Sequence, residues 1–205
     1  MQTDPLPQVS EAEPTGEAPR PVYYFAWLGL WGTLERKALP AKGKRPPRQV
    51  YVLQEPHLGE VPLWFPKGAR ERIPGWVFQR NLGRIVLVHL APRTDARGLW
   101  SARESQALNF TRKEEVKPPQ FQARGRLVGV DLEEGLLLLE VRPNPEGLLK
   151  EPFRLTLYAS LTLLEALPPV GSGVYLEGEL RPKTRRLVVR RAEPAPLWDD
   201  QAASF

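Results

Sequence analysis

The 205-residue sequence contains no cysteine, one methionine and two histidines. Without cysteine, disulfides, thiolate nucleophiles and thiolate metal sites are excluded. His57 and His89 stand far apart and outside any ligand motif, and we interpret His89, with its apolar neighbours, as structural. The adjacent acids of the chain have no third ligand spaced to complete a metal site. We therefore predict a protein that is not an enzyme and that uses no metal or cofactor.

Long apolar runs are missing as well. No stretch approaches the roughly 18 apolar residues that a membrane-spanning helix needs. Residues 1–21 have neither the basic region nor the apolar region of a secretory signal. We therefore expect no membrane association and a cytoplasmic location.

Charge is plentiful, and it is unevenly distributed. The net charge is +5, whereas residues 1–20 and 193–205 each carry −3, so the body of the chain is strongly basic. A basic body favours a polyanionic partner, although a solvated basic surface has the same composition. Arginine outnumbers lysine 21 to 8, and 23 prolines are present, which suits a thermostable protein.

Short β-type runs, separated by Gly and Pro, fill the chain between two tails. The expected strands are 23–34, 49–54, 61–65, 84–91 and 98–103, then 121–131, 136–142, 153–159, 174–181 and 186–192. The charged segment 112–120 contains a double proline and is interpreted as a linker. Five strands are thus expected on each side of it.

The two halves resemble each other. GRIVLVHLAPRT (83–94) and GVYLEGELRPKT (173–184) share Gly, six residues, Leu, one residue, Pro, a basic residue and Thr. FAWLG (25–29) matches FQARG (121–125) more loosely, at an offset of 96. A repeat of this length indicates two copies of one domain rather than a solenoid.

Each half also has room for a helix between its third and fourth strands. LTLLEALPPVG (161–171) predicts one in the second half, and 66–76 has room for a turn or two in the first. This order is that of the OB-fold, a five-stranded barrel that binds oligonucleotides or oligosaccharides. We therefore predict an all-β protein with a disordered tail (1–21), a first OB-fold domain (22–111), the linker (112–120), a second OB-fold domain (121–193) and a disordered acidic tail (194–205).

The repeat assigns faces to the first strand, because strand residues alternate sides. Phe121 and Leu127 should face the core, so by the offset of 96 the aromatic residues Phe25, Trp27 and Trp31 should do so too. The alternate residues then form an exposed apolar strip, which favours an interface between subunits or domains. The predicted interface residues are Ala26, Leu28 and Leu30.

Two basic clusters fall where an OB-fold holds nucleic acid, on the loops between strands 1 and 2 and between strands 4 and 5. They comprise Arg36, Lys37, Lys42, Lys44, Arg45 and Arg48 in the first half, and Arg181, Lys183, Arg185, Arg186, Arg190 and Arg191 in the second. Single-strand binders also stack bases on aromatic side chains. We select Trp64 and Trp100 as the stacking pair, since each is flanked by basic or turn residues.

The run GVYLEGELR (173–181) resembles the fourth strand of the bacterial single-stranded DNA-binding proteins, where a similar run leads into a basic hairpin. The resemblance implies an OB-fold protein that binds single-stranded DNA in replication, recombination or repair. It also implies dimers with four barrels. The family's acidic C-terminal peptide, which recruits partner proteins, has a possible counterpart in Trp198, Asp199, Asp200 and Phe205, without the penultimate proline.

Two alternatives stay open. An RNA-binding OB protein has the same sequence features. A non-catalytic accessory subunit of a replication, repair or transcription complex would instead use the strip Ala26, Leu28 and Leu30.

Overall fold

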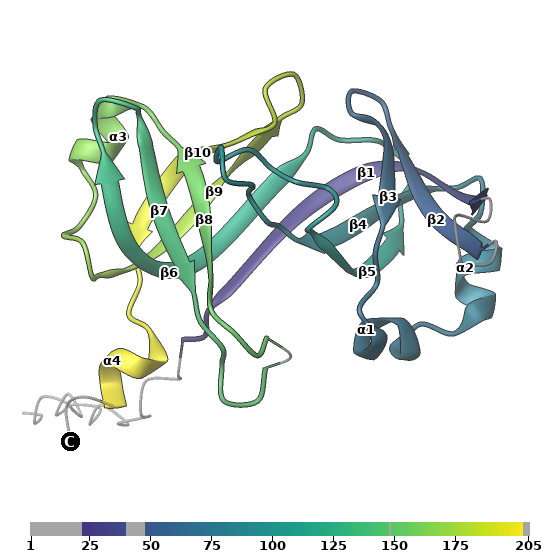
Figure 1. Cartoon of the computed structure of the whole chain (residues 1–205), viewed down its shortest axis with the longest axis horizontal. Helices are drawn as coiled ribbons and strands as arrows, with labels where there is room; N and C mark the ends of the chain where they lie inside the picture. The colour runs from purple at the N-terminus through teal and green to yellow at the C-terminus, as the bar shows by residue number, and fades with distance from the viewer. Residues whose placement is uncertain (1–21, 40–47, 148, 203–205) are drawn as a thin grey trace, which may run out of the picture.

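A computed structural model describes residues 22–39, 48–147 and 149–202 of the chain (Figure 1). The protein is mostly β-structure, as predicted, with ten strands and four short helices in this described part. In chain order they are β1 (Phe25–Leu39), β2 (Arg48–Glu55), β3 (Gly59–Leu63), α1 (Lys67–Arg72), α2 (Gly75–Asn81), β4 (Ile85–Ala91), β5 (Gln106–Arg112), β6 (Gln120–Asp131), β7 (Leu136–Val141), β8 (Phe153–Tyr158), α3 (Leu161–Glu165), β9 (Gly173–Arg181), β10 (Arg186–Pro194) and α4 (Trp198–Ala202).

The strands of the second half close a circuit of pairings. β6 pairs with β7 and β7 with β8, all antiparallel; β8 pairs with β10 in parallel; β10 pairs with β9, and β9 returns to β6. The side chains that alternate inward, such as Leu139, Leu155 and Leu176, are fully buried. Between β8 and β9, α3 is capped by Ser160, whose hydroxyl accepts a hydrogen bond from the amide of Leu163 at 3.3 Å. Leucine-rich alternation therefore builds a core enclosed by five strands.

The first half has the same connectivity, except that its third and fifth strands, β3 and β5, do not pair in the described structure. Its strands follow the order β3-β2-β1-β4-β5, and the two ends meet at one backbone hydrogen bond, from the amide of Ala107 to the carbonyl of Trp64 at 2.8 Å. Between β3 and β4, α1 and α2 occupy the place of α3. The ring of Phe78 on α2 is buried against Tyr51, with ring centroids 4.2 Å apart. Aromatic packing thus closes this half at the helices.

Matching hydrogen bonds define how the halves correspond. Leu34 donates to the carbonyl of Arg84 at 3.0 Å and accepts from the amide of Gly83 at 2.8 Å. Leu127 makes the equivalent bonds with Ser172 and Gly171, at 2.9 and 2.7 Å. The offset between the first strands is therefore 93, not the predicted 96.

Close approaches at two glycines support this correspondence. Gly32 and Gly125 each lie two residues before the equivalent leucine. A Cβ atom at either position would lie within 2.6 Å of a carbonyl oxygen of the neighbouring strand, at Gln54 or Glu140. Only glycine lets the strands approach so closely, and the requirement recurs in both halves.

The error of three residues reversed the predicted faces of β1, because an odd shift moves every side chain to the other side of a strand. Leu28 and Leu30 are fully buried, and Ala26 is partly buried against the core. Of the three aromatic residues predicted to be core, Phe25 and Trp27 are half-buried on the opposite face, whereas Trp31 is buried. The prediction of an exposed apolar strip is therefore wrong, and it no longer supports a role as an accessory subunit.

The start of β1 instead joins the two halves. Residues Phe25 to Gly29 pair antiparallel with Gln120 to Arg124 of β6, so one ten-stranded sheet runs through the molecule (Figure 1). Leu28 lies opposite Phe121, and each precedes its equivalent leucine by six residues. Each first strand thus meets its own counterpart, as at a local two-fold axis.

The fifth strand was predicted at 98–103, and that prediction is wrong. The strand is β5, and residues 92–105 form a long connection in which Thr94 and Trp100 make an isolated bridge. The shared Leu-x-Pro-basic-Thr pattern had suggested a tight hairpin in both halves. Only the second half has one.

The connection 92–105 crosses to the second half. The amide of Trp100 donates to the carbonyl of Arg185 at 2.7 Å, and the amide of Thr156 donates to the hydroxyl of Thr94 at 3.1 Å. Gly98, with φ of 74°, packs against Thr156; a Cβ atom there would lie 2.7 Å from its methyl group. The part of the outer face of β8 around Thr156 is therefore covered by the first half.

The chain end is ordered through α4. Ala195 and Leu197 are buried, and the amide of Trp198 donates to the carbonyl of Val22 at 3.0 Å. Figure 1 shows α4 below the second half, near the start of β1. A structureless acidic tail from 194 is therefore wrong up to the end of α4; residues 1–21 and Phe205 lie outside the described part. None of the described helices is long and apolar enough to cross a membrane.

Candidate nucleic-acid interface

The hairpin of β9 and β10 carries one predicted basic cluster. The turn closes through a hydrogen bond from the amide of Arg185 to the carbonyl of Arg181 at 2.8 Å, with Arg185 at a φ of 56°. All six predicted residues of this hairpin are exposed: Arg181, Lys183, Arg185, Arg186, Arg190 and Arg191.

Carboxylates on the same strands neutralise half of the cluster. Glu179 lies 3.3 Å from Arg181 and 2.5 Å from Arg190, and these arginines, Arg190 most strongly, lower its pKa. Arg191 pairs with Glu193 and lies 3.6 Å from Glu177. Three of the six cations are therefore already engaged.

The remaining three, at the tip, lack such partners. Among the described residues no carboxylate lies within 4 Å of Lys183, Arg185 or Arg186. The guanidinium carbon of Arg186 lies 4.3 Å from the ring centre of Tyr158, which fixes its stem against β8. The tip thus offers three exposed positive charges to an external anion.

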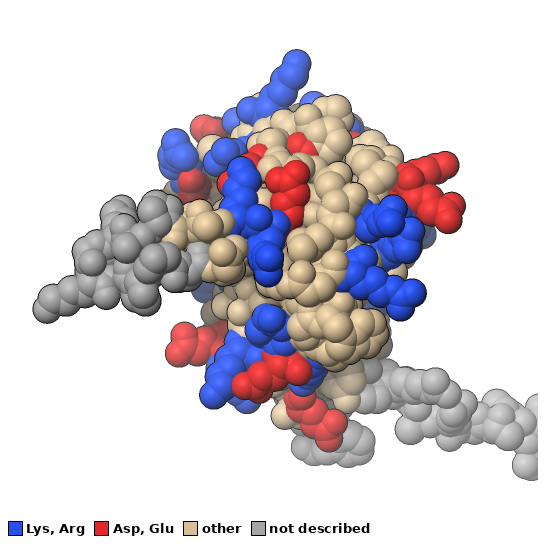
Figure 2. Space-filling model, turned by 90° about the vertical axis from the view of Figure 1, so that its right-hand side faces the viewer, with Lys and Arg blue, Asp and Glu red and all other residues tan. Residues whose placement is uncertain are grey.

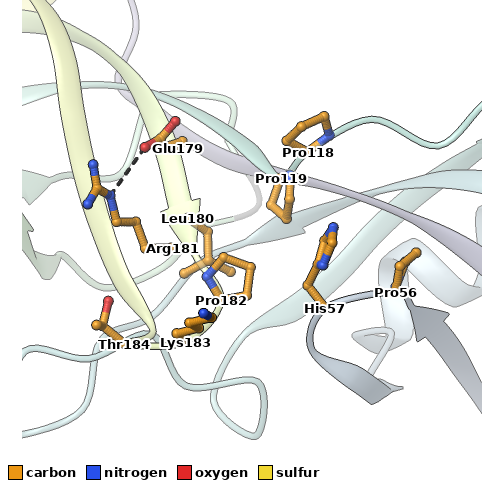
Figure 3. Close-up of a pocket in the computed structure, with 10 residues that line it drawn as sticks. All are labelled: Pro56, His57, Pro118, Pro119, Glu179, Leu180, Arg181, Pro182, Lys183 and Thr184. Carbon is orange, nitrogen blue, oxygen red and sulfur yellow. Dashed lines mark hydrogen bonds and ion pairs between the residues drawn. The ribbon is translucent and has the colours of Figure 1, made fainter.

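A groove of about 700 Å³ runs beside this tip (Figure 3). It separates the hairpin of the second half from the β2–β3 turn of the first half and from the β5–β6 connection. Its polar groups include Arg181, Lys183 and His57. Its apolar walls are formed by four prolines: Pro56, Pro118, Pro119 and Pro182. Flat apolar walls beside cations suit a planar ring attached to an anionic group.

The first-half cluster is only partly described. Arg36 and Lys37 are exposed near the end of β1, and Lys37 pairs with Glu60 of β3. Three predicted members, Lys42, Lys44 and Arg45, lie outside the described residues. The side chain of Arg48 is not described either. No contact in the described part brings this cluster to the β9–β10 hairpin.

The predicted stacking pair does not form an exposed platform. Trp100 is 2% exposed in the core, so its assignment is wrong, and Trp64 is half-buried where β3 ends. Trp76 at the start of α2, by contrast, is 63% exposed, and Arg80 lies one helical turn further on. Its position directly after Pro74 and Gly75 was the signal in the sequence.

The surface of the first half around this helix end has mixed charge. Figure 2 shows Lys and Arg side chains interleaved with Asp and Glu over that end of the molecule, rather than gathered in one patch. The β9–β10 tip and the groove beside it are therefore the better-defined candidate interface.

The acids of the predicted recruiting tail bind within the chain. Asp199 accepts hydrogen bonds from Tyr24 and Arg126, both at 2.9 Å, and Arg126 also lies 2.6 Å from Asp200. Burial raises the pKa of Asp200, but bonds from the amide of Leu197 and from Arg126 outweigh it and leave the pKa lowered. Asp199 and Asp200 therefore anchor α4 to β6.

The described residues contain no group of three or more metal-ligating side chains. No protein-family model matches the chain, and no curated protein matches it either, so its function has to be inferred from the geometry above.

Proposed function

We propose that each half is an OB-type barrel and that the protein binds single-stranded DNA with little sequence preference. The pairing order of the second half supports this most directly: first strand to second, second to third, third to fifth in parallel, fifth to fourth, fourth to first, with a helix between third and fourth. That is the OB order, and OB-folds hold oligonucleotides with the loops between strands 1–2 and 4–5.

The contacts would come from the 4–5 hairpin of the second half. Lys183, Arg185 and Arg186 bind phosphates, because no carboxylate in the described part competes for them. The groove beside them receives a base between proline walls, with His57 opposite the hairpin. A base reaches such a groove only when it is unpaired, which favours single strands over duplex.

The connection 92–105 restricts the path of the strand. In the second half it covers the outer face of β8 around Thr156, and β8 is one of the two strands across which an OB-fold normally lays its ligand. The bound strand therefore follows the hairpin tip and the groove towards the first half. The proposal makes the protein a divergent relative of the bacterial single-stranded DNA-binding proteins, acting in replication, recombination or repair.

A titration with oligo-dT, poly-rU and duplex DNA, followed by tryptophan fluorescence at two salt concentrations, tests the proposal. We expect oligo-dT to bind more tightly than duplex and to weaken steeply with salt, since each phosphate contact releases counterions. Tighter binding of poly-rU would assign the protein to RNA instead. Absence of binding to every nucleic acid at low salt would refute both assignments.

A further inference from the structure

A second cavity, of about 730 Å³, lies between the halves on the side away from the hairpin. It is bounded by the start of β1, α1, β5 and the connection between β7 and β8. Its volume lies within the range of cavities that hold small organic ligands. We refer to it as the inter-half pocket.

One cation in the inter-half pocket lacks a counter-charge. The guanidinium carbon of Arg93 lies 3.5 Å from the ring centre of Phe153, and Nη1 donates to the carbonyl of Pro92 at 2.9 Å. No carboxylate in the described part lies within 4 Å of Arg93, although the side chain is mostly withdrawn from water. Burial lowers the pKa of Arg93, and the more distant Glu104 only partly offsets this.

A guanidinium has five N–H donors, and the described contacts of Arg93 use one of them. Stacking on Phe153 fixes its plane and leaves an edge for a bidentate anion. Lys150 is a further cation in the same lining, and it is exposed, whereas Arg142 is already paired with Glu140 and Asp199. Among the described residues that line the pocket, Glu151 is the only acid.

We propose that the inter-half pocket binds a phosphate monoester, carried either by a small molecule of nucleotide size or by the 5′ end of a nucleic-acid strand. Two unneutralised cations suit a group that carries close to two negative charges at neutral pH. The half-buried ring of Phe25 in the lining provides an apolar surface for the attached organic part. This site does not depend on the proposed binding of single strands at the hairpin.

Thermal melting with added ligand tests the pocket directly. Deoxyadenosine monophosphate should raise the melting temperature by roughly 5–10 °C at a concentration one hundred times its dissociation constant, and deoxyadenosine should not. An oligo-dT with a 5′ phosphate that binds at least about tenfold more tightly than the same oligomer with a 5′ hydroxyl would identify the strand end as the source. If deoxyadenosine monophosphate leaves the melting temperature unchanged and the 5′ phosphate does not tighten binding of the oligomer, the proposal is wrong, whether or not the oligomer binds at the hairpin.

Arg93→Gln should weaken phosphate binding at least about tenfold. Arg97→Gln, in the same connection but exposed and paired with Asp95, should leave it unchanged. If both variants bind phosphate like the wild type, the pocket is not the site. Should Arg93→Gln fail to fold, Lys150→Gln replaces it, because that side chain is exposed; it should weaken binding several-fold, and unchanged binding would overturn the proposal.

Discussion

Neutralising the tip of the β9–β10 hairpin gives the sharpest test of the proposed DNA contacts. The perturbation is the triple variant Lys183→Gln, Arg185→Gln and Arg186→Gln, which removes the hairpin cations that lack a carboxylate within 4 Å in the described structure. All three side chains are exposed, so the fold should be unaffected.

The magnitude follows from counterion release. Each phosphate contact on a single strand contributes about 0.7 to the slope of log affinity against log salt, so three contacts contribute about 2. Between 50 and 200 mM salt the wild-type protein should therefore lose roughly 20-fold more affinity for oligo-dT than the triple variant does. Fluorescence titrations at four or more salt concentrations measure both slopes.

A matched control carries the same loss of charge elsewhere. Arg84, Arg112 and Lys113 are exposed and lie together, since the amide of Lys113 donates to Ile85 beside them. Their replacement by Gln should leave the salt slope close to that of the wild type. If both triple variants flatten the slope equally, only the overall charge matters and the assignment of the hairpin fails.

Three further predictions concern the fold. Gly125→Ala should destabilise the protein by about 1–3 kcal/mol, because the new Cβ would lie 2.6 Å from a backbone carbonyl of β7. Gly129→Ala, whose new Cβ would meet its neighbours only at 3.4 Å or more, should not; equal urea midpoints for the two variants would contradict the close approach of β6 and β7 at Gly125. In the same assay Trp100→Ala should lower the free energy of unfolding by about 3–5 kcal/mol, because its ring is buried. Trp76→Ala should lower it by less than about 0.5 kcal/mol, because that ring is exposed, and similar losses for the two variants would contradict this difference in burial. Because the pKa of Asp200 is lowered on folding, the ionised carboxylate stabilises the fold at neutral pH, and this stabilisation is lost as the pH falls through the lowered pKa. Asp200→Asn should therefore reduce the loss of stability between pH 7 and pH 3. An unchanged loss would show that Asp200 does not anchor α4.

The sequence predicted the strands well where turns are short. Gly and Pro mark the ends of nearly every strand, and alternating leucines mark the inward face of β8. The inward face of β1 was predicted wrongly. The loose match of FAWLG (25–29) with FQARG (121–125) gave an offset that is wrong by three, and an odd error assigns every side chain of the strand to the other face. The hydrogen bonds of Leu34 and Leu127 establish the offset, and they join residues far apart in the chain.

The candidate interface was predicted in part. A basic hairpin is visible in sequence, and the exposure of its arginines follows from alternation. Which cations are neutralised depends on cross-strand neighbours such as Glu179 and Arg190, and the groove depends on segments 56–57, 118–119 and 179–184 meeting in space. Such meetings are set by tertiary packing rather than by local pattern.

The pairing of β1 with β6 joins the two similar halves within one chain, in the way that an interface joins two subunits. A pair of separate subunits joined by such a pairing would dissociate on dilution, whereas here the pairing of Leu28 with Phe121 is intramolecular. The arrangement of the halves is therefore independent of protein concentration. Two halves in one chain can also differ from each other. The connection 92–105 of the first half packs on β8 of the second, and no described segment of the second half makes the equivalent contact with the first.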